Sequence, residues 1–499
     1  MKKFLALFLM FALLLTMASA REAAEETVIV LGETVTVNGA PITEDTTAPV
    51  YMAYVVELHS DVPEDRAGLP NSVVTIATAG TYRVSGTAEN TQLAVRAGEN
   101  DRVRVILDGV DITCRTAPAI AVFSGFDPKT PGEYGVVIEL ADDSYNIVRG
   151  SHTKRILDTD TKMDGAIDSL ISLGFEGTNG RLDVEADNEG IEVKFGHMTI
   201  NGGVFHINAA DDPLNVSEDF VGVLTMNDGY LFSAVRNEEG GEGDGIDSNG
   251  YIYFNGGTAI NLAHPGSMDG GIDSDMGSYI NGGLIVGAGN MYDEVEKDSA
   301  QLFMMLEFAE STDDLLVVTN SEGVPVFAFD FPHDFMYICF STPHLIEGEI
   351  YHVYLGGEIV GTQEDGLYTA IESYVPGRQL HHGAGVAEMR TDIAMPAMDE
   401  DASSGEQAPA FDEGQSSGDS AGEQAPAFDE SQSSGDSAGQ QAPAGEEGAS
   451  NGDSAGDPAM GEDASFGGPA GMQSSSEVAT GDFLLTRESC TYSNLTVGE

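Results

Sequence analysis

The chain contains no tryptophan and only three cysteines among its 499 residues. Cys114, Cys339 and Cys490 are widely spaced and odd in number, so they form neither a disulfide framework nor a cysteine-rich metal site. The sequence does not decide whether two of them form a disulfide. The lack of tryptophan disfavours a flat aromatic platform for crystalline cellulose, because such a platform needs large exposed rings.

Basic side chains are also scarce. The sequence has 21 lysines and arginines against 83 aspartates and glutamates, a formal net charge of -62. Such a charge repels phosphate backbones and anionic lipid head groups unless cations intervene. We therefore expect no nucleic-acid partner. We also expect no direct membrane insertion, because no second long apolar run follows the N-terminal segment.

The N-terminal segment has the pattern of an export signal. Lys2 and Lys3 precede an apolar run that extends from Phe4 to Met17. Ala18, Ser19 and Ala20 then form an A-x-A cleavage site. The pattern predicts a signal peptide at 1–20 and a secreted, extracellular protein. An uncleaved signal that acts as an anchor is the alternative, and association with a cell surface is left open.

The C-terminal part changes composition. Residues 396–482 are rich in Ala, Gly, Ser, Pro, Asp and Glu, contain no Lys or Arg, and include a near-exact repeat that starts at Gly405 and again at Gly422. This composition predicts a disordered acidic tail at 391–481, and a solvated spacer is favoured over a specific ligand motif. The segment 482–499 regains strand-like alternation, so we expect it to pair back onto the folded body.

The body consists of short alternating or β-branched runs separated by Gly, Asn and Asp, which predicts an all-β protein. A unit of roughly two dozen residues recurs within it. One apolar residue per unit falls in a single column, each after a small or turn-forming residue: Ile167, Ile191, Leu214, Ile246 and Ile272. Midway through successive units lie four asparagines, in motifs such as TINGGVFHI: Asn201, Asn227, Asn255 and Asn281.

A parallel β-helix explains both columns, because successive coils stack about 4.8 Å apart and equivalent side chains then lie above one another. Asparagine suits the corners because it tolerates left-handed backbone and its amides can hydrogen-bond from coil to coil. We predict an N-terminal cap region at 21–72 and the β-helix at 73–292.

The period lapses after residue 292. Longer strand-like runs such as LLVVTN and IYHVYLGG predict a small antiparallel β-subdomain at 293–390 that covers the end of the solenoid. Residues 297–310 are the one segment of the body with a helix-like pattern.

The repeated D-G-I-D-S-N-G and I-N-G-G motifs resemble those of secreted carbohydrate-binding-domain proteins of anaerobic Gram-positive bacteria. The resemblance covers about residues 73–354. It implies a right-handed parallel β-helix similar to pectate lyases, calcium binding, and binding of plant-wall polysaccharides, including acidic pectic chains and cellulose. One coil departs from the pattern, because Pro213 and Leu214 replace the usual Gly-Ile and Asn215 replaces an acidic residue.

Acidic residues form further columns beside the apolar one. Stacked carboxylates repel one another, and lysine and arginine are scarce in these turns, so we expect a bound cation. Oxygen ligands without His or Cys favour calcium over zinc or copper. Asx turns with exposed carboxylates are the alternative. The predicted metal ligands are Asp164, Asp168, Asp211, Asp212, Asp244, Asp247, Asp269, Asp273 and Asp275.

Calcium would also let an acidic protein bind an anionic glycan, because the cation can bridge two sets of carboxylates. Neutral sugars stack on aromatic rings instead, and Tyr230, Tyr251 and Tyr253 are the candidate carbohydrate-binding residues. Ordinary packing is the alternative role for these rings.

Three functional classes are compatible with the sequence. A polysaccharide-binding module ranks first, a polysaccharide lyase or hydrolase second, and a structural or adhesive surface protein third. A lyase needs a base whose pKa is tuned by its neighbours. The basic candidates are more consistent with charges that pair with nearby acids: Lys162, Arg181, Lys194 and Arg236. A hydrolase needs two carboxylates in opposed environments, and a periodic array does not single out two.

Overall fold

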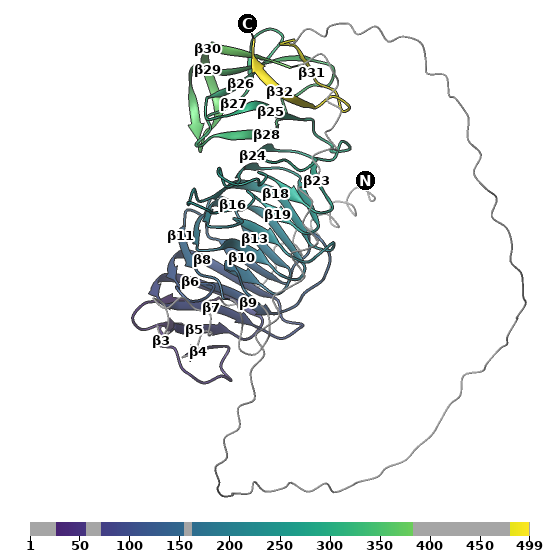
Figure 1. The fold of residues 1–499 in the computed structure, drawn as a ribbon. Coiled ribbons are helices and arrows are strands. Elements are labelled where there is room, and N and C mark those ends of the chain that lie inside the picture. The colour runs from purple at the N-terminus through teal and green to yellow at the C-terminus, as the bar shows by residue number, and fades with distance from the viewer. Residues whose placement is uncertain (1–25, 56–70, 154–161, 383–479, 499) are drawn as a thin grey trace, which may run out of the picture. The chain divides into compact units, whose positions relative to one another are not determined.

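The computed structural model describes residues 26–55, 71–153, 162–382 and 480–498 (Figure 1). The predicted signal peptide at 1–20 lies outside these residues, as do part of the cap region at 21–72 and nearly all of the predicted acidic tail at 391–481. The described residues belong to one compact unit and contain strands but no helix. The predicted all-β class is therefore confirmed.

The helix-like pattern at 297–310 is misleading, because strand β25 (Phe303–Thr312) covers much of it. Within the described part of the chain, no helix is long and apolar enough to cross a membrane.

The smaller of two sheets contains nine strands among the described residues, parallel except for the antiparallel pair β4 and β5. In order across the sheet, they are β4 (Val50–Val55), β5 (Asn71–Ile76), β7 (Thr91–Arg96), β9 (Ile120–Ser124), β12 (Gly165–Ser169), β15 (Glu189–Val193), β17 (Leu214–Val216), β19 (Asp247–Ser248) and β22 (Asp273–Ser274). Ile167 pairs with Ile191, and Ile191 with Leu214. All five residues of the predicted apolar column are buried in the core.

The larger sheet closes on itself. Strand β8 pairs with both β10 and β11, these pair with β13 and β14 respectively, and both of the latter pair with β16. The result is a closed barrel of six parallel strands, to which further strands are attached. The ring consists of β8 (Val103–Thr113), β10 (Val136–Leu140), β11 (Tyr145–Gly150), β13 (Leu173–Gly177), β14 (Arg181–Ala186) and β16 (His197–Ala209).

This closure contradicts the predicted right-handed parallel β-helix solenoid. The reason is local: the Asn-Gly-Gly motif was expected to end a strand at a corner, but β16 continues through it with a register shift between Ile200 and Val204. Gly202 permits this bend, because its φ is +148° and an added Cβ would lie 2.3 Å from the carbonyl oxygen of Gly177. One long strand can therefore pair with two shorter strands on one side, as β16 does with β13 and β14, and with another long strand, β18, on the other.

The other strands of the larger sheet flank this ring. Toward the N-terminus they are β1 (Thr27–Leu31), β2 (Thr36–Val37), β3 (Ala40–Pro41) and β6 (Gly80–Glu89). Beyond the ring they are β18 (Val223–Val235), β20 (Tyr251–Phe254), β21 (Thr258–Leu262), β23 (Gly277–Ile280) and β24 (Leu284–Gly289). Strand β18 pairs with β16 on one side and with β20 and β21 on the other, so it repeats the arrangement of β16.

The antiparallel strands that follow are part of the same sheet, because β24 pairs antiparallel with β28. They are β25, β26 (Leu316–Asn320), β27 (Pro325–Phe329), β28 (Phe335–Ser341), β29 (Ile350–Glu364) and β30 (Leu367–His381). The C-terminal segment adds β31 (Phe483–Leu484) and β32 (Thr491–Val497), which pair with β29 and with β25 and β30 respectively. Cys114, Cys339 and Cys490 are buried and free.

The predicted asparagine column is a continuous hydrogen-bonded ladder. The Asn227 amide donates to Asn201 at 2.7 Å, Asn255 to Asn227 at 2.9 Å, and Asn281 to Asn255 at 2.9 Å. Both ends are capped: Asn201 donates to the Tyr134 hydroxyl, and Asn281 accepts the backbone N–H of Ala300. The ladder therefore holds successive repeats in register.

Replacing Asn255 by alanine removes two of these amide bonds, so we expect the free energy of unfolding to fall by about 1–2 kcal/mol. The shift of the urea midpoint measures this change. Asn208→Ala is the matched control, because Asn208 is exposed on β16 and its side chain makes no hydrogen bond within the described residues. Equal midpoints for the two variants would contradict a stabilising ladder.

Candidate functional site

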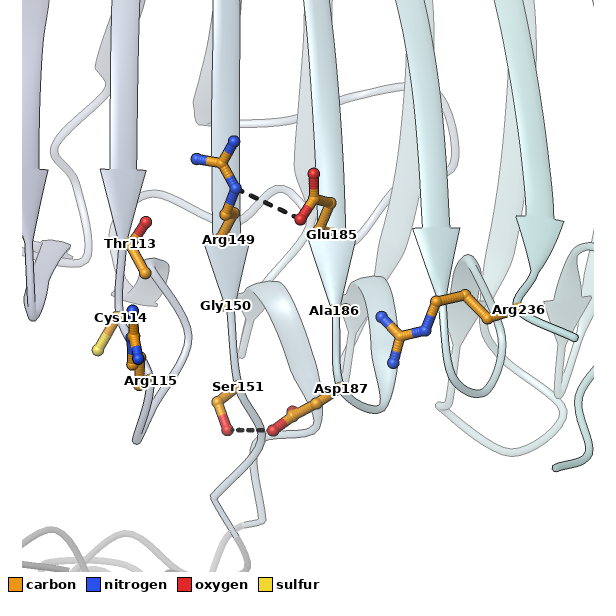
Figure 2. Close-up of a pocket in the computed structure, with 10 residues that line it drawn as sticks. All are labelled: Thr113, Cys114, Arg115, Arg149, Gly150, Ser151, Glu185, Ala186, Asp187 and Arg236. Atoms are coloured by element: carbon orange, nitrogen blue, oxygen red, sulfur yellow. Dashed lines mark hydrogen bonds and ion pairs between the residues drawn. The ribbon is translucent and has the colours of Figure 1, made fainter. Parts of the chain in front are cut away.

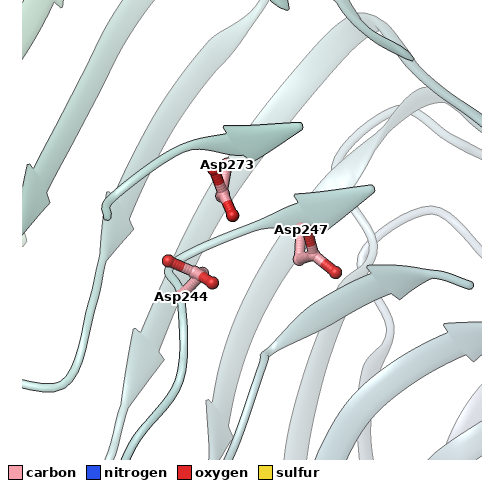
Figure 3. Close-up of side chains that lie close together, drawn as sticks. All are labelled: Asp244, Asp247 and Asp273. Carbon is pink, nitrogen blue, oxygen red and sulfur yellow. The ribbon is translucent and has the colours of Figure 1, made fainter. Parts of the chain in front are cut away.

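Three aspartates of the predicted set converge on one point. Asp247 and Asp273 pair directly as the first residues of β19 and β22, and Asp244 lies in the turn that precedes β19. One carboxylate oxygen from each lies within 4.8 Å of the other two. Figure 3 shows the three side chains close together on two adjacent repeats. We call Asp244, Asp247 and Asp273 the aspartate cluster.

Hydrogen bonds between repeats fix the turns that carry these residues. The Asp244 carboxylate accepts the backbone N–H of Gly270 at 2.6 Å, and the Asp212 carboxylate accepts the backbone N–H of Asp244 at 2.7 Å. Asp269 accepts the backbone N–H of Gly243 at 2.8 Å. Asp244 and Asp269 are therefore anchored through one oxygen each, whereas Asp212 also accepts the Asn215 amide through its other oxygen at 3.5 Å.

The electrostatics of the aspartate cluster favour protons or cations. Burial, followed by the charge of Asp273, raises the pKa of Asp244 to about 8 and that of Asp247 to about 7. Burial and Asp275 also raise the pKa of Asp273. Among the residues that the structure describes, every charged neighbour that shifts these three pKa values is an aspartate. Within the described ranges, no basic side chain is therefore among the groups that cause these shifts.

A second group of acids lies one repeat earlier. Burial raises the pKa values of Asp212, Asp211 and Glu189, and the acids add to one another's shifts. Glu189 is buried, and its Oε2 atom has no hydrogen-bond partner. The Asn215 amide lies 3.3 Å from the other oxygen of Glu189. Glu189 was absent from the predicted set, although it occupies the column just before the apolar residue.

The earliest acids of the column have lysine partners. Lys194 lies 2.8 Å from Asp164 and also contacts Glu192, and Lys162 lies 3.1 Å from the same Asp164 oxygen. Asp168 is fully buried, and its pKa is raised well above the usual value by burial and by Glu192. The expectation that basic residues are too scarce to neutralise these turns is thus wrong for this repeat.

Asp293 lies at the C-terminal end of the acidic column, beyond Asp273. It was not among the predicted ligands. Its carboxylate accepts the backbone N–H of Ser274 at 3.2 Å, and burial followed by Asp273 raises its pKa to about 6. Asp293 lies beyond the last recognisable repeat, so the sequence period could not indicate it. Asp275 is exposed beside the aspartate cluster, and Asp269 is half-buried.

Three tyrosines form an aromatic row on the outer face of β20 and β23. The rings of Tyr253 and Tyr279 stack at 5.0 Å with an interplanar angle of 12°, and Tyr251 lies 6.1 Å from Tyr253. All three are half-buried, whereas the alternating residues of these strands are buried in the core. We call Tyr251, Tyr253 and Tyr279 the tyrosine row. Two of them were predicted candidates.

The third predicted tyrosine lies elsewhere. Tyr230 stacks on His206, and its hydroxyl donates to Asp365 at 2.7 Å, in the turn between β29 and β30. His206 Nε2 also lies 2.9 Å from that carboxylate. Tyr230 therefore joins the repeats to the antiparallel strands, and the structure does not bring it together with Tyr251 and Tyr253.

The tyrosine row and the aspartate cluster share the same repeats. Tyr251 follows Asp247 by four residues, which limits their Cα separation to about 14 Å even for fully extended chain. The two features lie on strands of different sheets, β19 in the smaller sheet and β20 in the larger one. Together they form the candidate site.

Residues 70–304, a little less than half of the chain, match the family described as carbohydrate-binding domain-containing protein. A solved structure of a polysaccharide lyase-like protein from C. thermocellum, a gadolinium derivative, is 22% identical over 52% of this chain and 93% of that chain. Its TM-score is 0.34, a likeness too weak to argue from. No curated protein matches the sequence.

The raised pKa values predict that, in a chelator, the free energy of unfolding falls as pH rises from about 4 to 8. The folded chain then holds protons on Asp244 and Asp247 that the unfolded chain, with aspartate pKa values near 3.9, has released. Asp273→Asn removes the second-largest cause of both shifts and should flatten the dependence. Urea midpoints at about pH 5 and pH 8 measure it.

Asp142→Asn is the control, because Asp142 is an exposed carboxylate in the turn between β10 and β11. A slope that is the same in the wild type, the Asp273 variant and this control would contradict mutual repulsion within the aspartate cluster.

Proposed function

We propose that this protein is a secreted, extracellular polysaccharide-binding protein that holds calcium and recognises acidic plant-wall glycans of the polygalacturonate type. The observation that carries the proposal is the aspartate cluster: three carboxylates converge within 4.8 Å without a basic partner among the described residues. The match of residues 70–304 to a carbohydrate-binding family supports the glycan partner. The N-terminal export pattern supports secretion.

The donor set fits calcium. All three ligands are carboxylates from adjacent repeats, and such hard oxygen donors without His or Cys suit calcium better than zinc or copper. Calcium takes about six to eight oxygens, so further ligands would come from nearby acids, backbone carbonyls, water or the glycan itself. A divalent cation at this point would lower the pKa values of Asp244 and Asp247, because it favours their ionised forms.

The acidic aspartate cluster, once it holds calcium, favours a negatively charged glycan. Aspartates 244, 247 and 273 repel a uronate chain directly, whereas a calcium ion held by them can also accept sugar carboxylates and hydroxyls. The cation then supplies the attraction that the scarce lysines and arginines do not. An acidic glycan is therefore a better partner for this cluster than a neutral one.

Binding is favoured over catalysis by the state of the acids and of Lys194. A lyase base must give up its proton near neutral pH, but the contacts of Lys194 with Glu192 and Asp164 raise its pKa despite burial. A hydrolase needs two carboxyls with opposed pKa values, whereas those of Asp244, Asp247 and Asp273 all shift upward.

Asp247→Asn is expected to weaken calcium binding at least about 10-fold, because it removes one of three convergent charges. Isothermal titration with calcium chloride measures the loss, and Asp142→Asn serves as the control with the same change in net charge. Calcium binding that is equal in both variants would show that the aspartate cluster is not the site.

Titration with polygalacturonate in calcium and in chelator tests the function itself. We expect heat of binding in calcium, most of which is lost in chelator, and no growth of absorbance at the unsaturated-uronate band. Growing absorbance would identify a lyase instead. Absence of heat in both buffers would favour a structural surface protein.

The tyrosine row should contribute to glycan affinity through ring edges and hydroxyls, because its faces are largely turned toward one another. Tyr279→Ala is expected to weaken glycan binding about 3- to 10-fold with calcium binding unchanged. Tyr54→Ala is the control, since Tyr54 is 59% exposed on β4. Unchanged glycan affinity in the Tyr279 variant would assign the row to packing alone.

A further inference from the structure

A separate pocket of about 350 Å³ lies at the C-terminal ends of parallel strands of the larger sheet. Figure 2 shows the ten residues that line it: Thr113, Cys114, Arg115, Arg149, Gly150, Ser151, Glu185, Ala186, Asp187 and Arg236. Three of them are arginines, in a chain with only 21 basic residues against 83 acidic ones. Two are acids, so the lining carries more positive than negative charge.

In-register pairing brings these residues together. Thr113 of β8 pairs with Arg149 of β11, and Arg149 pairs with Glu185 of β14. Ser151 lies two residues after Arg149, and Asp187 lies two residues after Glu185. The Ser151 hydroxyl donates to the Asp187 carboxylate at 2.7 Å. Arg236 follows β18, and its guanidinium turns back toward Ala186 (Figure 2).

Arg149 and Arg236 keep hydrogen-bond donors for a ligand. A guanidinium has five N–H groups. Arg149 directs its Nη1 to Asp111 at 2.7 Å and its Nε to Glu185 at 3.3 Å, which leaves its second terminal amino group. Arg236 uses its Nε for Glu238 at 2.8 Å, which leaves both terminal amino groups. Two guanidinium groups with such donors in one pocket suit a planar carboxylate, because a guanidinium can bind both oxygens of a carboxylate at once.

We infer that this pocket binds the carboxylate of an acidic sugar residue without calcium. Its volume corresponds to about a dozen water molecules at roughly 30 Å³ each, which is comparable to a single hexuronate with about thirteen non-hydrogen atoms. Thr113 lines the pocket and offers a hydroxyl for the sugar ring. The inference extends the proposed function, because it assigns a second contact with the same class of glycan.

The position of the pocket supports one continuous binding surface. Asp187 lies two residues before Glu189, the first residue of β15, so the pocket adjoins the acidic column of the smaller sheet. A uronate chain can therefore place one carboxylate against arginine and later ones against calcium. A chelator removes the calcium contact but not the arginine contact, so binding measurements in chelator can separate the two.

The experiment measures binding of a short galacturonate oligosaccharide by isothermal titration in chelator at low salt. Arg236→Gln is the main variant, because its ion pair with Glu238 is solvent-exposed and its loss costs the fold little. We expect wild-type binding in chelator, a loss of about 10-fold or more in this variant, and no change in Arg378→Gln. Arg378 is exposed and pairs with Asp314 outside the pocket.

Two further ligands distinguish the chemistry. A neutral galactose oligosaccharide of equal length should not bind in chelator, and inorganic phosphate at equal ionic strength should not displace the uronate. Equal binding of the neutral sugar, displacement by phosphate, or identical affinities of the two arginine variants would overturn the inference. Absence of binding in chelator would overturn it as well, while calcium-dependent binding to polygalacturonate would leave the proposed function standing.

Discussion

The in-register stacking of parallel strands is the constraint on which the rest of this structure depends. Adjacent strands lie about 4.8 Å apart, so each residue meets its equivalent in the next repeat. For Ile167 and Ile191 this proximity removes apolar surface from water. For the asparagines it aligns amide donors with amide acceptors along four repeats. For carboxylates the same proximity is unfavourable, because like charges are held together in a partly buried place.

The acidic column meets this repulsion in different ways along its length. At the first repeats Lys194 lies against Asp164 and Glu192, so the compensation is part of the chain. At Asp244 and Asp247 burial and the repulsion raise the pKa values to about 8 and 7, so both side chains hold their protons more tightly than a free aspartate. The gradient from lysine to unpaired aspartate locates the candidate site within an otherwise periodic array. Periodicity alone could not locate it.

The apolar and asparagine columns could be predicted from the sequence, because one residue type recurs in them at the length of the repeat and such recurrence indicates stacked side chains. The closure of the larger sheet could not, since the Asn-Gly-Gly motif has the composition of a turn although β16 passes through it. The contact of Tyr230 with Asp365 could not be predicted, because the two residues are 135 positions apart in the sequence. Asp293 and the arginine pocket draw on residues outside the repeat or of mixed type, and no single pattern in the sequence connects them.

A net charge of -62 also limits how this chain can meet an anionic glycan. Exposed charges are screened beyond about 8 Å at physiological ionic strength, so repulsion acts mainly at short range, where the aspartate cluster and the arginine pocket also act. Long-range steering therefore contributes little to association. Under the proposed function, affinity for an acidic glycan therefore arises from contacts in which a cation or a guanidinium meets a carboxylate directly. Such contacts depend on the spacing of charges along the glycan, so the proposed function predicts selection of a glycan by the geometry of its carboxylates rather than by its total charge.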